Sequence, residues 1–260
     1  MKPISELREA GRIRALLFDI DETLTTEGKL TSEAYAALER LKRAGKLLIP
    51  VTGRPAGWCD HIARMWPVDA VVGENGAFYF GFFDNKLSKR YHDDTDTRAR
   101  NRARMEGIAE RILAAVPGCA LASDQAYRAT DLAIDYCEDV APLPLAAAEH
   151  IAALMREAGL TARISSIHVN GWFGGYDKLS MSRTLFRERF ELELAVANPE
   201  VVFVGDSPND APLFAFFENS VGVANVRRFE HLLSHEPRYV TRAASGAGFA
   251  ELAAQLLSCG

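Results

Sequence analysis

The sequence has few cysteines and none of the spacings that would give them a structural role. Its 260 residues contain four, namely Cys59, Cys119, Cys137 and Cys259. They form no C-x-x-C pair and no zinc-ligand pattern. We therefore expect free thiols in a reducing cytosol, and neither a disulfide framework nor a zinc site.

Long apolar runs and an excess of positive charge are also absent. No apolar run approaches the roughly 20 residues that a membrane-spanning helix needs. The opening stretch, MKPISELREAGRIR, lacks the apolar core of a signal peptide. Thirty Lys and Arg residues against 35 Asp and Glu residues give a net charge of −5. We expect a cytoplasmic protein that binds neither nucleic acid nor membrane, although local positive charge still permits small anionic ligands.

What is present is a series of short apolar runs that end in polar residues. The composition, 48% hydrophobic and 25% charged, is ordinary for a globular protein. The main runs are Ala15–Phe18 before DIDET, Leu47–Val51 before TGRP, Ala70–Val72 before GENG and Val201–Val204 before GDSPND. Helical patterns such as SEAYAALERLKRAG separate several of them. This alternation predicts an α/β fold with a Rossmann-like parallel sheet, whose ligands bind beyond the carboxyl ends of the strands.

The middle of the chain has a different pattern. Two helical stretches, RARNRARMEGIAERILAAV and PLAAAEHIAALMREAGL, are each followed by segments typical of a strand pair. This order predicts an α+β insert with its own small core. We expect residues 1–82 to form the first part of the α/β core, residues 83–175 the insert, and residues 176–260 the second part of the core.

Carboxylates gather where two of the predicted strands end. Asp19 and Asp21 are two residues apart in an extended segment and should face the same side. Asp206 and Asp210 follow a different strand. Four carboxylates at one sheet edge cannot all remain ionised without a cation, and oxygen ligands with no nearby Cys or His favour Mg²⁺ over Zn²⁺. The sequence therefore predicts a magnesium site.

Four motifs occur in an order that resembles the haloacid dehalogenase superfamily. They are D-x-D-x-T at 19–23, T-G-R at 52–54, Lys178 before a helix, and G-D-x-x-N-D at 205–210. The insert between the second motif and the lysine, together with NGA at 75–77, resembles the Cof-type subgroup (subfamily IIB) with its C2B cap domain. The resemblance implies a Mg²⁺-dependent phosphatase that acts on a small phosphorylated metabolite, with sugar phosphates as the usual substrates.

The resemblance also implies roles for individual residues. Asp19 would be the nucleophile that forms an aspartyl-phosphate. Asp21 would protonate the leaving group and then activate water. Thr52 and the Gly53 amide would bind phosphoryl oxygens, and Lys178 would neutralise the charge shared with the phosphate.

The implied metal ligands are the Asp19 carboxylate, the Asp21 backbone carbonyl and Asp206, with Asn209 and Asp210 supporting them. Two positions depart from the family pattern, which usually has glycine at each. A side chain at Glu22 would narrow the entrance or add negative charge, and Leu179 follows the catalytic lysine. Both departures bear on substrate identity more than on the chemistry.

Substrate selection is expected to involve the cap. In the cap, Arg128 is a candidate site for a second anionic group, His168 and Asn170 are candidate polar contacts, and Trp172 offers an aromatic face that would stack on a sugar ring. In the core, the candidates are Arg54 and Asn75. The full set of expected substrate-binding residues is Thr52, Gly53, Arg54, Asn75, Lys178, Asn209, Arg128, His168 and Asn170.

Other functions remain open at the level of sequence. A phosphomutase of the same fold, similar to phosphomannomutase, would share Asp19 and Asp21, and a regulator that binds a ligand without turnover would keep only the fold. Sugar phosphates, polyol phosphates, a nucleotide-sugar precursor, mannosyl-3-phosphoglycerate and a vitamin phosphate are all candidate substrates. The sequence does not distinguish a monomer from a homodimer.

Overall fold

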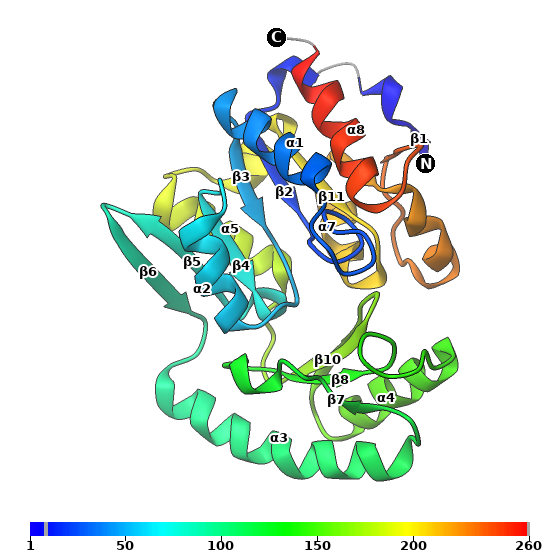
Figure 1. Ribbon diagram of the computed structural model, residues 1–260. Helices are drawn as coiled ribbons and strands as arrows, with labels where there is room; N and C mark the ends of the chain where they lie inside the picture. The colour runs from blue at the N-terminus through cyan, green and yellow to red at the C-terminus, as the bar shows by residue number, and fades with distance from the viewer. Residues whose placement is uncertain (8–9, 259–260) are drawn as a thin grey trace.

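The computed structural model describes residues 1–7 and 10–258 and consists of a core with a smaller cap beside it (Figure 1). The three cysteines in this range, Cys59, Cys119 and Cys137, form no disulfide. Cys259 lies outside the described residues. Within the described part of the chain, no helix is both long enough and apolar enough to cross a membrane.

A six-stranded parallel sheet forms the centre of the core. Its strand order is β1 (Lys2–Pro3), β13 (Tyr239–Val240), β12 (Asn219–Gly222), β11 (Val201–Gly205), β2 (Ala15–Phe18) and β3 (Leu47–Pro50). Each pair of neighbouring strands is parallel. The predicted α/β core is therefore confirmed, and the carboxyl ends of its strands lie along one edge.

Helices cover both faces of this sheet, as near-continuous apolar strands require. On one face, Leu16 and Phe18 pack against α1 (Ser32–Arg43) and α8 (Ser245–Leu257). On the other, Ala15 and Leu17 pack against α5 (Lys178–Arg189), α6 (Leu194–Ala197) and α7 (Ala211–Phe216). Successive residues of β2 thus enter opposite halves of the core.

A second, antiparallel sheet extends the core towards the cap. It contains β4 (Ala70–Gly73), β5 (Phe78–Phe83) and β6 (Lys86–Tyr91), and α2 (Ala56–Met65) packs against it. A parallel bridge between Val51 and Val72 joins it to the main sheet. The expected boundary at residues 82 and 83 falls at the end of β5. Because β6 pairs with β5, we place the start of the cap after β6.

The cap is a four-stranded antiparallel sheet with helices on one side. Its strand order is β7 (Ala120–Leu121), β8 (Leu132–Asp135), β10 (His168–Trp172) and β9 (Thr161–Ile164). Helices α3 (Thr95–Ala115) and α4 (Leu145–Glu157) share an apolar core with one face of this sheet. Figure 1 shows the cap sheet lying between α3 and the core. The expected order of helix, strand pair, helix and strand pair is therefore found.

Alternation along β10 decides which cap residues face the core. Val169 lies in the cap's apolar cluster with α3 and α4. His168 and Asn170, one residue to either side, line the cavity beside Asp19. The period of two that defines a strand thus brings polar cap side chains to the carboxyl ends of the core strands.

Candidate active site

The ends of three neighbouring core strands bring the predicted motifs together. β2 pairs in parallel with β11 on one side and with β3 on the other. Asp19 follows β2, Asp206 follows β11, and Thr52 lies just beyond β3. The Asp19 amide donates to the carbonyl of Val204 at 2.9 Å and thereby fixes the turn into the site. All three polar side chains are buried.

Three carboxylates and one lysine form the centre of this site. Oxygen atoms of Asp19, Asp206 and Asp210 lie within 4.8 Å of one another. The Nζ atom of Lys178 contacts Asp19 Oδ1 at 2.9 Å and Asp210 Oδ1 at 2.7 Å. Burial, opposed by Lys178 and assisted by the neighbouring carboxylates, raises the pKa of Asp19 to about 7. Burial alone would lower the pKa of Lys178, but the two carboxylates raise it instead.

The donor set fits a hard divalent cation. Asp206 Oδ2 accepts a hydrogen bond from Asn225, whereas Oδ1 is buried and finds no hydrogen-bond partner among the described residues. Burial and the neighbouring carboxylates raise the pKa of Asp206 well above its usual range. An orphaned buried carboxylate oxygen is costly unless a cation satisfies it. Asp19 and Asp206 together therefore suit Mg²⁺.

Asp210 is engaged differently from the other two carboxylates. Its Oδ2 accepts the amide hydrogens of Asp206 and Ser207 at 3.1 and 3.4 Å, and its Oδ1 accepts from Lys178. Protein donors therefore occupy both of its oxygens. This geometry favours a supporting role, in which Asp210 orients the Asp206 backbone and the lysine.

The start of α5 positions Lys178. Asp177 caps the helix, accepting from the Ser180 amide at 2.7 Å, and Ser180 closes a reciprocal capping box. Gly76, at φ +105°, lies directly against Asp177 at the N-terminus of α5. A Cβ atom built on Gly76 would come within 2.0 Å of the Asp177 carbonyl oxygen. The glycine of NGA is therefore what allows the lysine to approach the site.

We expect Gly76→Ala to lower both stability and activity. The substitution combines a left-handed backbone with a contact against main chain that cannot rotate away, and we expect a loss of about 1–3 kcal/mol in the free energy of unfolding. Gly107→Ala is the matched control, because Gly107 lies inside α3 with open space around its Cβ position. The control should be stabilised by up to about 1 kcal/mol. Urea unfolding of both variants measures the difference, and equal effects would contradict this account.

Thr52, Asn75 and Asn209 are buried polar residues at this edge of the core. Thr52 is fully buried, and Asn75 lies beside it at φ 54° in η3 (Glu74–Gly76). Asn75 Nδ2 is buried and, among the described residues, finds no acceptor, while its Oδ1 lies 3.5 Å from Asn209 Nδ2. Asn75 and Asn209 therefore lie together, and Asn75 retains amide hydrogens that no described acceptor uses.

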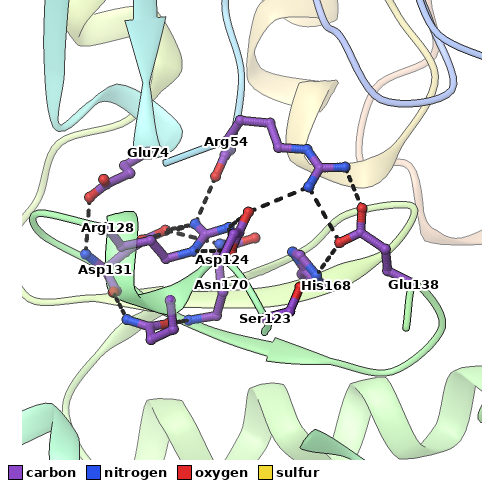
Figure 2. Close-up of polar contacts among 12 residues, drawn as sticks. Arg54, Glu74, Ser123, Asp124, Arg128, Asp131, Glu138, His168 and Asn170 are labelled. Carbon is purple, nitrogen blue, oxygen red and sulfur yellow. Dashed lines mark hydrogen bonds and ion pairs between the residues drawn. The ribbon is translucent and has the colours of Figure 1, made fainter. Parts of the chain in front are cut away.

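Arg54 links the core site to the cap (Figure 2). Its Nε donates to Asp21 Oδ1 at 2.9 Å, and its Nη2 contacts Glu138 Oε1 at 2.5 Å. A further contact joins Nη1 to Asp124 Oδ2 at 3.4 Å. Glu138 Oε2 also lies 2.9 Å from His168 Nε2. The guanidinium therefore holds one core carboxylate and two cap carboxylates at once.

Glu74, the acidic residue of GENG, forms a second connection between core and cap. Its fully buried carboxylate accepts the amide hydrogens of Ala129, Thr130 and Asp131 at 2.7–3.3 Å. It also accepts from the Thr130 hydroxyl and from the Ala56 amide at the start of α2. No periodicity or spacing in the sequence marks this role. The residue is a carboxylate anchor for the cap segment that precedes β8.

Arg128 cannot serve as the anion site that the sequence suggested. It is 3% exposed, and its guanidinium contacts Asp124 at 3.0 Å, Asp131 at 3.1 Å and the Gly53 carbonyl oxygen at 2.8 Å. Two carboxylates therefore already neutralise the charge of this arginine. Arg128 fixes the closed cap against the core loop instead of binding a ligand.

Trp172 is likewise not a stacking surface for a sugar. Its side chain is 1% exposed, its Nε1 donates to the Tyr176 carbonyl, and its ring stacks on Tyr176 at a centroid distance of 5.7 Å. It belongs to the apolar cluster between α2 and the cap linker. The expectation was wrong because Trp172 is the last residue of β10, and Tyr176 in the segment after that strand covers it.

The closed cap leaves almost no room beside Asp19. The cavity there has a volume of about 10 Å³, and Asp19, Asp21, Gly53, Arg54, Ser165, Ser166, Ile167, His168, Asn170 and Asn209 line it. This volume holds about one water molecule, whereas pockets for small organic ligands measure roughly 300–1,000 Å³. With the cap in this position, the cavity is therefore too small for an organic ligand.

The two departures from the family pattern lie outside this cavity. Glu22 adopts φ 54°, the left-handed region that explains why glycine is usual there. Its carboxylate accepts from the Gly28 amide and the Ser245 hydroxyl, so it braces core loops and does not narrow the entrance. Leu179 packs against the apolar cluster on one face of the core sheet.

Comparisons with known proteins agree with this architecture. Residues 16–98 match the haloacid dehalogenase-like hydrolase family. A HAD/COF-like protein from Plasmodium vivax superimposes with a TM-score of 0.72 at 19% identity, covering 99% of this chain and 100% of that chain. The sucrose-phosphatase from Synechocystis, solved with sucrose and phosphate, gives a TM-score of 0.63 at 15% identity, with coverages of 93% and 97%.

The C-terminal domain of trehalose-6-phosphate phosphatase from C. albicans gives a TM-score of 0.69 at 13% identity and covers both chains fully. Among curated proteins, no sequence matches this chain. The family match includes the D-x-D-x-T and T-G-R motifs, and the shared fold extends over nearly the whole chain. Over residues 16–98 the chain is therefore similar in sequence to haloacid dehalogenase-like hydrolases, and its core and cap share the fold of HAD/COF-like proteins.

Proposed function

We propose that this protein is a Mg²⁺-dependent phosphatase that hydrolyses a small phosphate monoester, with a sugar phosphate as the favoured substrate class. The observation that carries the proposal is the cluster in which Lys178 and three buried carboxylates meet at one sheet edge, with an unsatisfied oxygen on Asp206. Such a site is built to receive positive charge and a phosphoryl group together. The sugar-phosphate phosphatases among the structural neighbours share its fold.

Asp19 is the nucleophile in this proposal. Its carboxylate oxygen attacks phosphorus, the ester oxygen departs, and an aspartyl-phosphate results. Lys178, 2.9 Å from Asp19, stabilises negative charge on the nucleophile and on the transferring group. Asn75 and the Thr52–Gly53 turn bind the phosphoryl oxygens. Water then cleaves the acyl-phosphate and releases inorganic phosphate and free Asp19.

Asp21 transfers protons in both steps. In the closed cap its carboxylate contacts the Arg54 guanidinium at 2.8–2.9 Å. When substrate enters and the cap recloses, the phosphate competes for that guanidinium. Once released, Asp21 takes up a proton from solvent, donates it to the leaving oxygen, and later accepts a proton from the attacking water.

Asp19, Asp206 and the backbone carbonyl of Asp21 would hold Mg²⁺, with Asp210 in support. A bound dication would neutralise charge on the carboxylates and the phosphoryl oxygens. The chain's own contribution is to keep the ligands in place. Asp210 accepts the Asp206 amide, and Asn225 Nδ2 donates to Asp206 Oδ2 at 3.0 Å.

A phosphate-release assay tests the proposal. The protein is incubated with para-nitrophenyl phosphate, acetyl phosphate and a panel of sugar and polyol phosphates, with Mg²⁺ or with excess EDTA. We expect inorganic phosphate to appear with Mg²⁺, and the rate to fall at least about a hundredfold with EDTA. Full recovery on adding Mg²⁺ back is the control. Isomerised sugar phosphate without free phosphate would instead identify a mutase, and no turnover of any ester would refute the proposal.

A further inference from the structure

Glu138 is a cap carboxylate that the catalytic proposal does not use, yet it contacts two side chains that line the catalytic cavity. It contacts Arg54 at 2.5 Å and His168 at 2.9 Å (Figure 2). Although partial burial opposes it, the contacts with His168 and Arg54 lower the pKa of Glu138 to about 2. The carboxylate therefore remains ionised throughout the physiological pH range.

A dedicated loop structure holds Glu138 in this position. After β8, the buried carboxylate of Asp135 accepts the amide hydrogens of Cys137, Glu138 and Asp139 at 2.7–2.9 Å. Asp139 in turn accepts from the Ser123 hydroxyl at 2.6 Å. Three amides fixed by one carboxylate define the path of the loop backbone. The cap itself thus fixes the backbone position from which the Glu138 side chain extends, and Arg54 and His168 contact its carboxylate.

The charges around the cavity leave no place for a second anion. Among the described residues that line it, only Arg54 and His168 can carry positive charge. Both contact Glu138, and Arg54 also holds Asp21. Arg128, the other nearby cap cation, is saturated by carboxylates. The remaining cap lining is uncharged and includes Ser165, Ser166 and Asn170.

We infer that Glu138 determines substrate specificity by rejecting leaving groups that carry a carboxylate or a second phosphate, and by accepting neutral hydroxyl-bearing ones. The inference rests on the proposed phosphatase function and concerns the alcohol half of its substrate. A fixed carboxylate beside a small cavity repels a second anion. The same carboxylate accepts hydrogen bonds from the hydroxyl groups of a polyol, and the hydroxyls of Ser165 and Ser166 and the Asn170 side chain supply further hydrogen-bonding groups.

Matched pairs of phosphate esters test this inference. Glycerol 3-phosphate and 3-phosphoglycerate differ by one CH₂OH group in place of a carboxylate, as do sorbitol 6-phosphate and 6-phosphogluconate. For the wild-type protein with Mg²⁺, we expect kcat/KM for the alcohol of a pair to exceed that for the acid at least tenfold. In Glu138→Gln this ratio should fall at least fivefold, chiefly through a lower KM for the acid, because the repelling charge is gone and Arg54 has one fewer carboxylate partner.

Two controls separate charge from packing. Glu138→Asp keeps the charge and should keep the preference for the alcohol, whereas Glu110→Gln removes an exposed cap carboxylate on α3 and should leave the ratio unchanged. Thermal unfolding checks that each variant is folded. An unchanged ratio in Glu138→Gln, or an equal change in Glu138→Asp, would overturn the inference while the phosphatase proposal stands. Absence of phosphate release from every ester by the wild-type protein would overturn both.

Discussion

Replacing Asp19 with asparagine is expected to abolish phosphate release. Asparagine keeps the shape of the side chain but is a far weaker nucleophile than a carboxylate, and it cannot form the aspartyl-phosphate. We expect kcat to fall at least roughly a thousandfold. The measurement is release of inorganic phosphate from para-nitrophenyl phosphate with Mg²⁺.

The same variant should remain folded. Asp19 is 4% exposed and shares its cavity with two other carboxylates, so removing its charge relieves repulsion when no metal is bound. Thermal unfolding in EDTA should therefore occur at the wild-type temperature or above it. Asp60→Asn, which alters a carboxylate paired with Lys89 and Arg64 at the surface, is the control and should keep full activity. An Asp19→Asn variant with the wild-type rate would remove the basis of the proposed mechanism.

Lys178→Gln should damage both activity and stability, in contrast to Asp19→Asn. Lys178 is 3% exposed and is the ammonium group between Asp19 and Asp210. Removing one partner of a buried ion pair leaves uncompensated charge and costs about 3–5 kcal/mol. Loss of charge stabilisation in the transition state should also lower kcat by about 10²–10³.

Added Mg²⁺ distinguishes the two effects. The cation would offset the carboxylate repulsion, so Mg²⁺ should raise the unfolding temperature of Lys178→Gln more than that of the wild type. The rate should nevertheless stay low, because the metal does not replace the ammonium contact with the nucleophile. Lys86→Gln, an exposed change on β6, is the control for stability and rate. A fully active and stable Lys178→Gln variant would contradict the assignment.

The core and the centre of the site could be predicted because they depend on local patterns. Short apolar runs ended by polar residues place Asp19, Thr52 and Asp206 at the carboxyl ends of strands, and parallel pairing then brings those ends together. Lys178 was found through its place in the motif order. Its contacts with two carboxylates require the fold of the whole core.

The sequence contains a signal for the hairpin β5–β6, although residues from 83 onward were expected to belong to the insert. Phe78–Phe83 and Lys86–Tyr91 flank the dipeptide Asp84-Asn85, and both of these residues have positive φ. A two-residue turn with positive φ at both positions is typical of a tight hairpin. The polar sequence of β6 resembles an insert because this strand lies at the edge of its sheet.

The contacts between core and cap could not be predicted from spacing. Arg128 and Trp172 looked available because they lie on cap segments expected to face the site. Whether such a side chain is free depends on partners far away in the sequence, such as Gly53 for Arg128. Glu74 and Glu138 were missed for the same reason, since an isolated glutamate in a loop gives no pattern until the fold supplies its donors.

The division of labour between the two parts of the molecule has an evolutionary consequence. Asp19, Asp206 and Lys178 belong to the core, whereas Glu138 and its Asp135-bound loop belong wholly to the cap. Exchange of that loop could redirect the enzyme to new metabolites without disturbing bond cleavage. Selection can therefore act on the cap and the core separately, so that related chains differ in substrate while the reaction carried out by the core stays the same.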